Sequence, residues 1–392
     1  MKKIVKFFVF LFFLPAFVFV ATILALFQKR RKKISDQRVV WGPVPIINNK
    51  YWSHSIKKLV SFSETYTYDF YQRINKRSDW DRILTDQWSV APHFLKPYIA
   101  FLESLLRYDI FVIPCSGYFL GQTPLWRCEA FFLRIARKIV VVIPYGADAY
   151  VYRNIVSHSL AHVLQLSYPE YAKRQDEIEE KVSYWVKNAD VFMPGIMGID
   201  GMGRWDIVSH SSLCIDVDEW SMSKRFEGEQ KKELVIAHAP NHRGFKGTEF
   251  LLEAVAELIE EGHLVKLLLL EGLQNSELRR VLQNDVDILV EQLVFIGHGI
   301  NAVEGMSCGL PVIANLSDER YTEMFKRWGH LEECPIISAS PETIKDVLRS
   351  LIKQRDQLKE IGARSRVYVE KYHSFDSFLV TFKTVISKYF SG

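Results

Sequence analysis

The sequence predicts an α/β protein of two Rossmann-like domains, preceded by one N-terminal transmembrane helix. Three observations support this prediction. The length of 392 residues is long for one domain and natural for two. After Lys33, short β-branched runs alternate with helical patterns, as in α/β units with parallel strands. Near the N-terminus, Phe7–Phe27 is an uncharged apolar run.

That apolar run has the length of a membrane span. As a helix it would be about 31 Å long at 1.5 Å per residue, close to the roughly 30 Å hydrocarbon core. A secretory signal peptide is the alternative, but such a peptide has a shorter apolar region and ends in small residues. Here the run meets the basic cluster Lys29–Lys33, which favours an uncleaved anchor. The basic excess after the run predicts a cytosolic C-terminal portion by the positive-inside rule.

Composition and cysteine spacing exclude several classes of protein. The net charge of +4 is mild and much of it lies near the N-terminus, so no nucleic-acid partner is expected. The cysteines form no CxxC pair and no zinc-like Cys/His cluster, so we expect free thiols in a reducing compartment and no metal site. The five cysteines are Cys115, Cys128, Cys214, Cys308 and Cys334.

The remaining pattern predicts the elements of the two domains. Expected strands are Arg38–Trp41, Asp109–Ile113, Ile139–Ile143, Val191–Met193, Leu234–Ala237, Val265–Leu270, Asp287–Val290 and Pro311–Ala314. Expected helices are Ser53–Phe62, Trp126–Ala136, Tyr171–Asn188, Glu249–Glu261 and Glu277–Gln283.

A polar, charged stretch separates the two predicted domains. Residues 1–34 would hold the membrane anchor and its basic cluster, and 35–215 an acceptor-side domain. Residues 216–232 would be the linker. Residues 233–392 would form the second domain with its closing helices. Ligands of such sheets lie beyond the carboxyl ends of the strands, so a site is expected between the domains.

The strongest chemical signal follows the strand Leu234–Ala237. The loop after it carries Arg243 and Lys246, and a helix with an apolar face comes next. Arg presents a planar fork of donors to phosphate oxygens, Lys a compact charge, and the amides at a helix start also favour anions. This geometry suits a diphosphate. Two solvated surface cations are the alternative.

A second segment, from Gly297 to Ile313, has the pattern of a ligand-binding loop and a short helix. Gly297 and Gly299 allow the backbone to approach a ligand closely. Glu304, early in the helix, would face the ligand and accept hydrogen bonds from sugar hydroxyls. Alternatively, it would only interact with the helix dipole.

These residues resemble a known family. The segment Glu304-Gly-Met-Ser-Cys-Gly-Leu-Pro-Val-Ile313 is similar to the donor-site signature of GT-B glycosyltransferases of the group-1, family-4-like type, which includes many bacterial polysaccharide enzymes. The loop from Arg243 to Lys246 resembles the phosphate-binding loop of that family, and Ala363–His373 its closing helix. The resemblance covers roughly Leu234–His373.

The resemblance implies a set of donor contacts. Arg243 and Lys246 would hold the diphosphate of a UDP- or GDP-sugar, and Glu304 the nucleotide ribose. The backbone amides around Asn301 would cap the diphosphate. No permanently bound cofactor and no metal are expected. The family often carries a further Glu eight positions before Glu304, where this chain has Ile296.

The function implied is a membrane-anchored glycosyltransferase of cell-envelope polysaccharide synthesis, retaining in stereochemistry. The acceptor would be a glycan or a lipid-linked glycan, with membrane lipid and envelope-polysaccharide assembly proteins as further partners. Its expected location is the bacterial inner membrane, single-pass, with a cytoplasmic globular part. A catalytically inactive GT-B module acting as a membrane-tethered scaffold is the alternative, and a nucleotide-sugar epimerase is a third possibility.

The N-terminal half offers fewer signals. Gly42, Asn48 and Asn49 lie in the long loop after the first strand, which either borders the cleft or is a turn without a ligand. Asp148, in a Gly-Ala-Asp turn, would either orient an acceptor hydroxyl or cap the turn. His158, four residues before His162, is a weaker catalytic candidate, and a structural histidine is the alternative.

Overall fold

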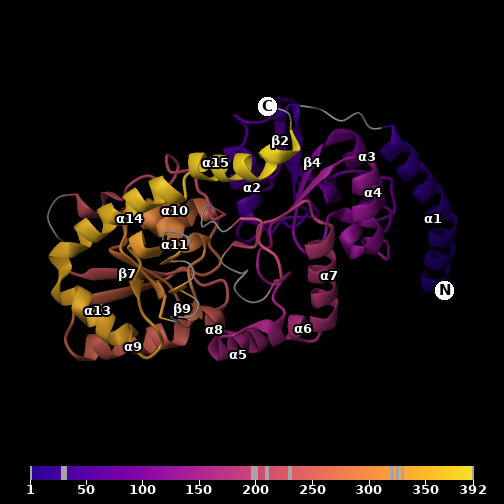
Figure 1. Cartoon of the computed structure of the whole chain (residues 1–392). Helices are drawn as coiled ribbons and strands as arrows, with labels where there is room; N and C mark the ends of the chain where they lie inside the picture. Colours follow the sequence, from indigo (N-terminus) through magenta and orange to yellow (C-terminus); the bar gives the residue numbers. More distant parts are fainter. Residues whose placement is uncertain are drawn as a thin grey trace.

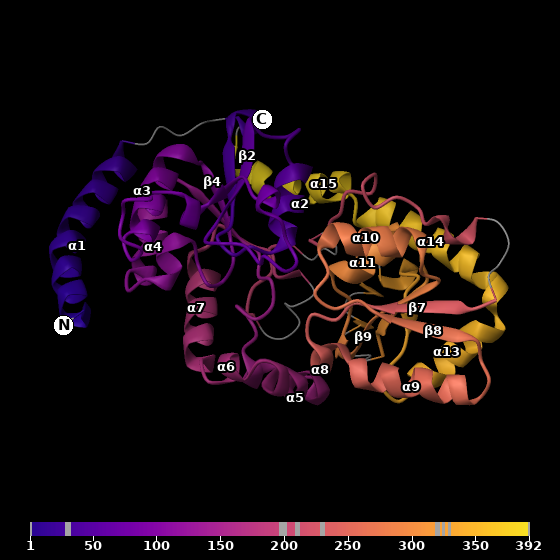
Figure 2. The same cartoon turned by 180° about the vertical axis from the view of Figure 1, so that it is seen from behind.

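The protein contains two parallel β-sheets with helices on their faces, side by side in an elongated molecule (Figure 1). The computed structural model describes residues 2–27, 33–195, 202–207, 212–227, 232–317, 322–323, 326–327 and 331–390. The N-terminal helix lies at one end of the molecule, and the second sheet lies at the other (Figure 2).

The first sheet has six strands in the order β3-β2-β1-β4-β5-β6, and every pairing is parallel. Its strands are β1 (Arg38–Trp41), β2 (Phe62–Thr67), β3 (Arg82–Ile83), β4 (Ile110–Ile113), β5 (Ile139–Val142) and β6 (Val191–Phe192). The helices of this half are α1 (Lys2–Leu26), α2 (Ile47–Ser55), α3 (Lys96–Arg107), α4 (Glu129–Ile135), α5 (His158–Ser167), α6 (Pro169–Ala172) and α7 (Gln175–Asn188).

The second sheet has five parallel strands in the order β11-β10-β9-β7-β8. They are β7 (Leu234–His238), β8 (Val265–Leu269), β9 (Ile288–Ile296), β10 (Val312–Asn315) and β11 (Ile337–Ser338). The helices are α8 (Arg243–Lys246), α9 (Thr248–Glu260), α10 (Asn275–Asn284), α11 (Ile300–Ser307), α13 (Ile344–Lys353), α14 (Leu358–Tyr372) and α15 (Phe375–Ile386).

All eight predicted strands are confirmed. The predicted α/β class is confirmed as well, because both sheets are parallel and alternate with helices. The strand β9 runs further than expected, to Ile296. The predicted helix Ser53–Phe62 is wrong, because α2 ends at Ser55 and β2 begins at Phe62. The run Phe-Ser-Glu-Thr-Tyr-Thr is rich in β-branched and aromatic residues, which pack well on a pleated surface. The structure adds three strands that the sequence did not reveal: β2, β3 and β11.

The last helix joins the two halves. α15 packs on α2, and the ring centroid of Trp41 in β1 lies 5.4 Å from that of Phe382 and 6.2 Å from that of Phe378. Trp52 also stacks on Phe378, with ring centroids 6.1 Å apart. All four side chains are buried in one apolar cluster that includes residues of both sheets. Burial of such large side chains holds the halves together on this side of the molecule.

A second connection lies on the opposite side, where α5 reaches the second sheet (Figure 1). Phe245 of α8 stacks on Phe295 of β9 with ring centroids 4.4 Å apart. Tyr168, just after α5, lies 5.8 Å from Phe245, and Tyr150 lies 6.1 Å from Phe295. These four rings form the bridge cluster, which therefore contains residues from both halves.

The N-terminal helix packs on the first half along one stripe. Phe17, Ala21 and Ala25 are buried, and the Phe17 ring makes edge contacts with Tyr98 of α3 and Phe132 of α4. The remaining described faces of the helix expose apolar side chains. The predicted transmembrane span falls largely within this helix. In the part of the chain that the structure describes, no helix combines the length and the apolarity needed to cross a membrane.

Candidate functional site

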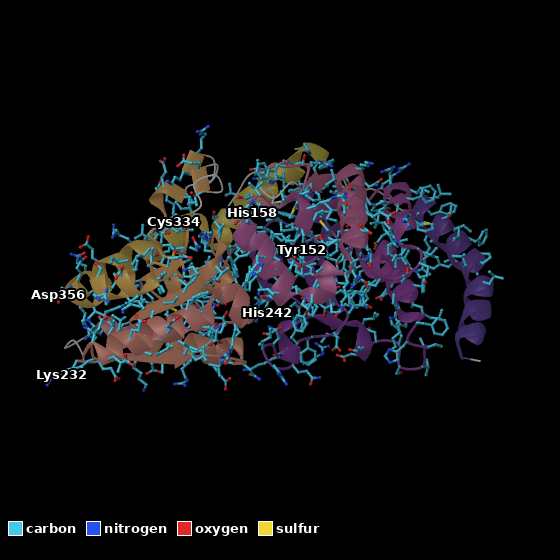
Figure 3. All side chains as sticks on the ribbon, turned by 90° about the horizontal axis from the view of Figure 1, so that it is seen from below. Tyr152, His158, Lys232, His242, Cys334 and Asp356 are labelled. Atoms are coloured by element: carbon cyan, nitrogen blue, oxygen red, sulfur yellow. The ribbon has the colours of Figure 1, made fainter. Side chains whose placement is uncertain are left out.

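A cleft of about 580 Å³ lies between the two sheets. One wall comes from loops after β1, β2, β5 and β6, and the other from loops after β7 and β9. The carboxyl ends of both sets of parallel strands thus open into one space, as expected for this architecture. Tyr152 of the first half and His242 of the second both lie at this boundary (Figure 3).

Lys246 is the basic side chain that the second half places in the cleft. It ends α8, is 9% exposed, and its Nζ forms an ion pair with Glu291 and a 2.7 Å hydrogen bond to Gln292 Oε1. Gly247 follows with φ +75°, and a Cβ there would lie 2.9 Å from Leu293 Cβ. The turn therefore requires glycine, and this turn directs Lys246 inward.

Arg243, the first residue of the four-residue helix α8, does not line the cleft. Its Nε and Nη2 donate to the two oxygens of Glu271 at 2.8 and 2.9 Å, and its Nη1 donates to Glu249 at 3.1 Å. The hydrogen bonds that Arg243 donates to Glu271 and Glu249 raise its pKa. The structure therefore brings Lys246 to the cleft and leaves Arg243 paired at the surface.

Gly299 lies directly above the Lys246–Glu291 ion pair. It precedes α11, lines the cleft, and its backbone N–H donates to Glu291 Oε2 at 3.3 Å. A Cβ at Gly299 would lie 3.2 Å from Glu291 Oε1 and 3.9 Å from Lys246 Nζ. The absence of a side chain here opens the start of α11 to the cleft, where the first amides of a helix favour an anion.

Glu291 and Gln292 are functional candidates that the sequence analysis missed. They stand in the middle of β9, an otherwise apolar strand, and only 1% of the Glu291 side chain is exposed. Burying a charged residue in such a strand is costly unless the charge is paired. A lone Glu within an apolar strand pattern is therefore a signal that the sequence alone could have given. Ile296, where the family often has a Glu, is buried at the end of the same strand.

Glu304 lies behind the cleft wall. Its Oε1 accepts from Asn275 Nδ2 at 2.9 Å and its Oε2 from Asn301 Nδ2 at 3.2 Å, and it is 3% exposed. Burial raises the pKa of Glu304 to about 7, against these two hydrogen bonds, which lower it. Gly297 is also structural in position: its N–H donates to Asn315 O at 2.8 Å. Glu304, Asn301 and Gly297 do not line the cleft.

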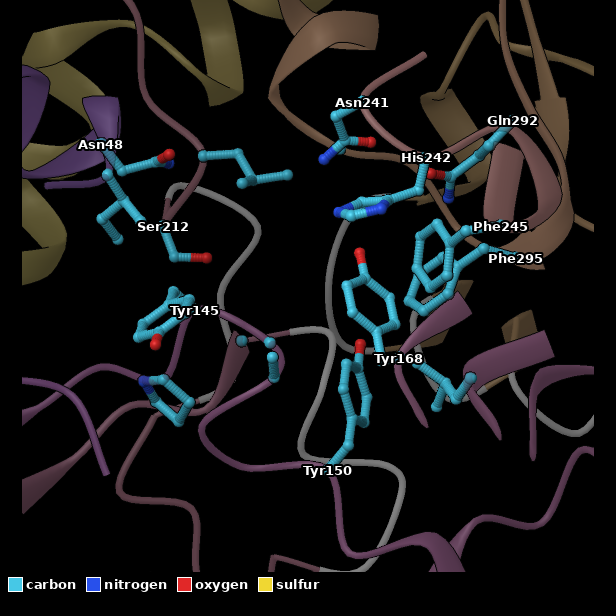
Figure 4. Close-up of a pocket in the computed structure, with 18 of the residues that line it drawn as sticks. Asn48, Tyr145, Tyr150, Tyr168, Ser212, Asn241, His242, Phe245, Gln292 and Phe295 are labelled. Carbon is cyan, nitrogen blue, oxygen red and sulfur yellow. The ribbon is translucent and has the colours of Figure 1, made fainter. Parts of the chain in front are cut away.

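The first half of the cleft wall is rich in aromatic side chains (Figure 4). Burial raises the pKa of Tyr145 and of Tyr168, so both phenols stay protonated at physiological pH. Across from them, burial and the Lys246 charge lower the pKa of His242, which lies 4.5 Å from Tyr168 between ring centroids. This histidine is therefore neutral and adds no charge at neutral pH.

Asp148 supports this wall from behind. It is 5% exposed, and its carboxylate accepts from the backbone N–H groups of Cys115 at 2.8 Å, Tyr145 at 3.0 Å and Gly146 at 3.1 Å. Burial raises the pKa of Asp148 to about 6, against hydrogen bonds led by that of Tyr145. Because Tyr145 and Gly146 both line the cleft, Asp148 holds the loop that presents them.

The other candidates from the first half divide between cleft and interior. Asn48, in α2, lines the cleft, whereas Asn49 is buried and donates to Val44 O at 2.8 Å. A Cβ at Gly42 would collide with the carbonyl oxygen of Tyr66, which explains the glycine structurally. His158 is exposed at the start of α5 and does not line the cleft. In the described residues, no three acidic, His or Cys side chains gather as a metal site would require.

The fold and the cleft define an α/β protein of two parallel sheets whose strand ends share one site. No protein-family model and no curated protein matches the chain. Solved structures do. HepE from Anabaena, in complex with UDP-glucose, has a TM-score of 0.58 at 11% identity, over 90% of this chain and 100% of HepE.

Two further comparisons give the same picture. HepE in complex with UDP and glucose has a TM-score of 0.58 at 12% identity, with 90% of this chain and 100% of HepE covered. A proposed UDP-N-acetylglucosamine 2-epimerase from Listeria monocytogenes has a TM-score of 0.51 at 10% identity, with 92% and 97% covered. At these identities the likeness shows the fold: the chain has the GT-B architecture.

Proposed function

We propose that this protein is a glycosyltransferase that moves a sugar from a nucleotide-sugar donor to an acceptor hydroxyl. The observation that carries the proposal is the second wall of the cleft, where Lys246 and the start of α11 at Gly299 converge. The Lys246 ammonium, paired with Glu291, lies beside the first turn of a helix, and the two together suit a diphosphate. HepE, which shares the fold, binds UDP-glucose and UDP, and this supports a UDP-sugar as the donor. A GDP-sugar is the alternative donor.

The reaction needs little chemistry from the protein. The acceptor oxygen bonds to the anomeric carbon as the bond from that carbon to the diphosphate oxygen breaks. The nucleoside diphosphate leaves with the electron pair and takes up the acceptor proton. Lys246 and the α11 amides stabilise the charge that develops on the leaving group, while the first wall aligns the acceptor hydroxyl.

The family resemblance implies two finer donor contacts, and each would require a rearrangement of the pairs described above. For Glu304 to hold the ribose, its oxygens would exchange hydrogen bonds with Asn275 or Asn301 for bonds to ribose hydroxyls. For Arg243 to reach the diphosphate, it would leave Glu271 and Glu249. We further propose a glycan or lipid-linked acceptor in cell-envelope polysaccharide synthesis and retention of anomeric configuration, which the family resemblance implies.

Nucleotide binding and transfer test the proposal. UDP or GDP at about 100 times its Kd should raise the unfolding free energy of the full chain by about 2.7 kcal/mol. A panel of UDP- and GDP-sugars should then give transfer or slow hydrolysis. If neither UDP nor GDP raised the unfolding free energy, the proposal would be overturned. Binding without turnover would favour the scaffold alternative, and an isomerised nucleotide sugar would favour an epimerase.

We propose that α1 attaches the protein to a membrane through the apolar face that it leaves exposed. Phe19 is 65% exposed, Leu26 63% and Phe27 80%, while the opposite stripe packs on α3 and α4. The sequence places lysines before the apolar run and the cluster Lys29–Lys33 after it. Apolar contact with acyl chains and cationic contact with anionic headgroups act together at a bilayer surface.

Vesicle binding tests this attachment. The full chain should bind vesicles containing anionic lipid at least about tenfold more tightly than neutral ones, since each basic residue near the surface contributes about 1 kcal/mol. Phe19→Lys should weaken binding strongly. The control Val380→Lys, at a 62% exposed position of α15, should not. Equal binding by both variants would show that α1 does not attach the protein to the vesicles.

A further inference from the structure

The first-half wall of the cleft combines aromatic faces with hydroxyl groups. Trp52 of α2 lines the cleft together with six tyrosines from the loops after β2 and β5 and from the α5–α6 region. Of the described residues that this half contributes to the cleft, none carries a formal charge. The six are Tyr71, Tyr145, Tyr150, Tyr152, Tyr168 and Tyr171.

The phenols of this wall act as neutral hydrogen-bonding groups. Burial is the first cause that raises the pKa of Tyr145, Tyr168 and Tyr71, and neighbouring tyrosines raise it further. These three phenols therefore remain protonated, and each can donate one hydrogen bond while accepting others. The rings provide flat apolar faces next to those groups.

The wall is held in place before any ligand arrives. The Tyr152 hydroxyl donates to the carbonyl oxygens of Leu164 at 3.3 Å and Tyr168 at 3.5 Å. Asp148 fixes the backbone of Tyr145 through two hydrogen bonds to that loop. Tyr168 also packs on His242 and Phe245 of the second half. A ligand would meet surfaces that already have their orientation, which lowers the entropic cost of binding.

The position of the wall relative to Lys246 indicates which ligand it serves. Phe245 precedes Lys246 in α8, and the Lys246 Nζ lies 5.8 Å from the Phe245 ring centroid. Tyr168 contacts the same ring from the first half. A group resting on the tyrosines is therefore next to the diphosphate-binding wall, where an acceptor must be.

We propose that the tyrosine wall is the acceptor subsite and that it takes an uncharged sugar ring. The C–H faces of the ring would stack on the aromatic side chains, and its hydroxyls would exchange hydrogen bonds with the phenols. This rests on the proposed glycosyl transfer. A uronic acid or sugar phosphate would be desolvated without a counter-charge on the described wall, which is costly. An alkyl chain would leave the phenols that it covers without partners.

Ligand-observed NMR on the full chain, saturated with UDP or GDP, tests the inference. The probes are neutral mono- and disaccharides, the matching uronic acids and sugar 1-phosphates, and alkyl alcohols of similar size. Neutral sugars should bind at least about tenfold more tightly than their charged counterparts. Preference for the charged sugars or the alkyl alcohols, or the failure of every neutral sugar to bind, would overturn the inference.

Three variants locate the binding on the wall. Tyr168→Ala should weaken neutral-sugar binding at least about tenfold, and Tyr168→Phe, which keeps the ring, about threefold. The control Phe250→Ala, at a 45% exposed position of α9, should leave it unchanged. Equal sugar affinity in all three would contradict the assignment. Nucleotide affinity is measured in parallel. If the wild-type chain did not bind UDP or GDP, the proposed function would be contradicted. If it bound nucleotide but no neutral sugar, only the subsite assignment would be contradicted.

Discussion

The two walls of the cleft differ in charge and in construction. The second half contributes Lys246, its ion-pair partner Glu291 and the start of α11, all set by one glycine turn and a polar pair in β9. The first half contributes aromatic and hydroxyl groups from loops after four strands. The second-half wall is therefore suited to a charged leaving group and the first-half wall to an uncharged reactant.

The division also explains why Lys246 is buried with a carboxylate. A buried ammonium without a partner is strongly disfavoured, and Glu291 supplies that partner. The same ion pair places the charge within reach of the cleft. Arg243 is not under this constraint, because it is exposed and paired with two surface carboxylates. Charge at the site is thus concentrated in the Lys246–Glu291 pair.

The largest effect should follow removal of the Lys246 charge. Lys246→Ala should lower kcat/KM for the nucleotide sugar by a factor on the order of 10³, because one donor to the developing leaving-group charge is lost. Steady-state kinetics of transfer measures this. Lys266→Ala, at an exposed position of β8, is the matched control and should leave the kinetics unchanged. Full activity of Lys246→Ala would refute the role of this wall.

A second effect concerns stability and pH at the second wall. Burial raises the pKa of Glu304 to about 7 from an ordinary value of 4.5. The native state therefore holds a proton that the unfolded state has lost between these values, so this group lowers the unfolding free energy as pH rises from about 4.5 to 7. The total is about 3 kcal/mol.

Glu304→Gln removes that dependence. Relative to the wild type, the variant should gain about 3 kcal/mol of unfolding free energy between pH 4.5 and pH 8. Denaturant unfolding at several pH values measures the difference in unfolding free energy between the two proteins. The contributions of the buried histidines cancel in this difference, because both proteins contain them. Parallel stability profiles for the two proteins would show that the native carboxyl ionises like an exposed one.

A smaller effect should mark the first wall. Asp148→Asn keeps the shape but turns one acceptor oxygen into a donor facing backbone N–H groups, so the loop with Tyr145 should shift. We expect KM for the acceptor to rise about tenfold, or about 1.4 kcal/mol, with KM for the donor within about twofold. In the wild type, acceptor KM should rise below pH 6, where Asp148 becomes protonated.

The two Michaelis constants separate the walls. If Asp148→Asn raised donor KM as much as acceptor KM, the loop would serve both substrates and the division of the cleft would be lost. Unchanged constants for both would mean that the three backbone hydrogen bonds are dispensable.

The smallest effect is expected at Arg243. Because Glu271 and Glu249 already pair it at the surface, Arg243→Ala should change kcat/KM less than about threefold. Transfer kinetics beside those of Lys246→Ala provides the comparison. A loss as large as that of Lys246→Ala would show that Arg243 leaves its carboxylates for the donor.

Much of the fold was predictable because its signals are local. Strands such as β1 and β10 are short β-branched runs bounded by Gly or Pro, and their bounds were predicted closely. The strand β2 was missed because Ser63 and Glu64 hide its apolar alternation, and Glu64 is stabilised there by the distant Arg107 and Tyr108. Such long-range pairing is invisible in a local pattern.

The candidate site was predictable in part. Lys246, Gly299 and Asn48, which the sequence pattern named as candidates, line the cleft, because motifs after strands converge at the carboxyl edge. The sequence pattern did not foresee that Arg243 would turn to Glu271 or that Glu304 would lie behind Asn275. It also did not foresee the tyrosine wall, which gathers side chains from segments far apart in the chain.

A crystal structure of the full chain with UDP would show where the diphosphate binds. We expect the diphosphate at hydrogen-bonding distance, about 3 Å, from Lys246 Nζ and from backbone amides at the start of α11, with the tyrosine wall left open to an acceptor. A diphosphate bound at Arg243 outside the cleft, or a uridine diphosphate seated on the tyrosine wall, would contradict this expectation.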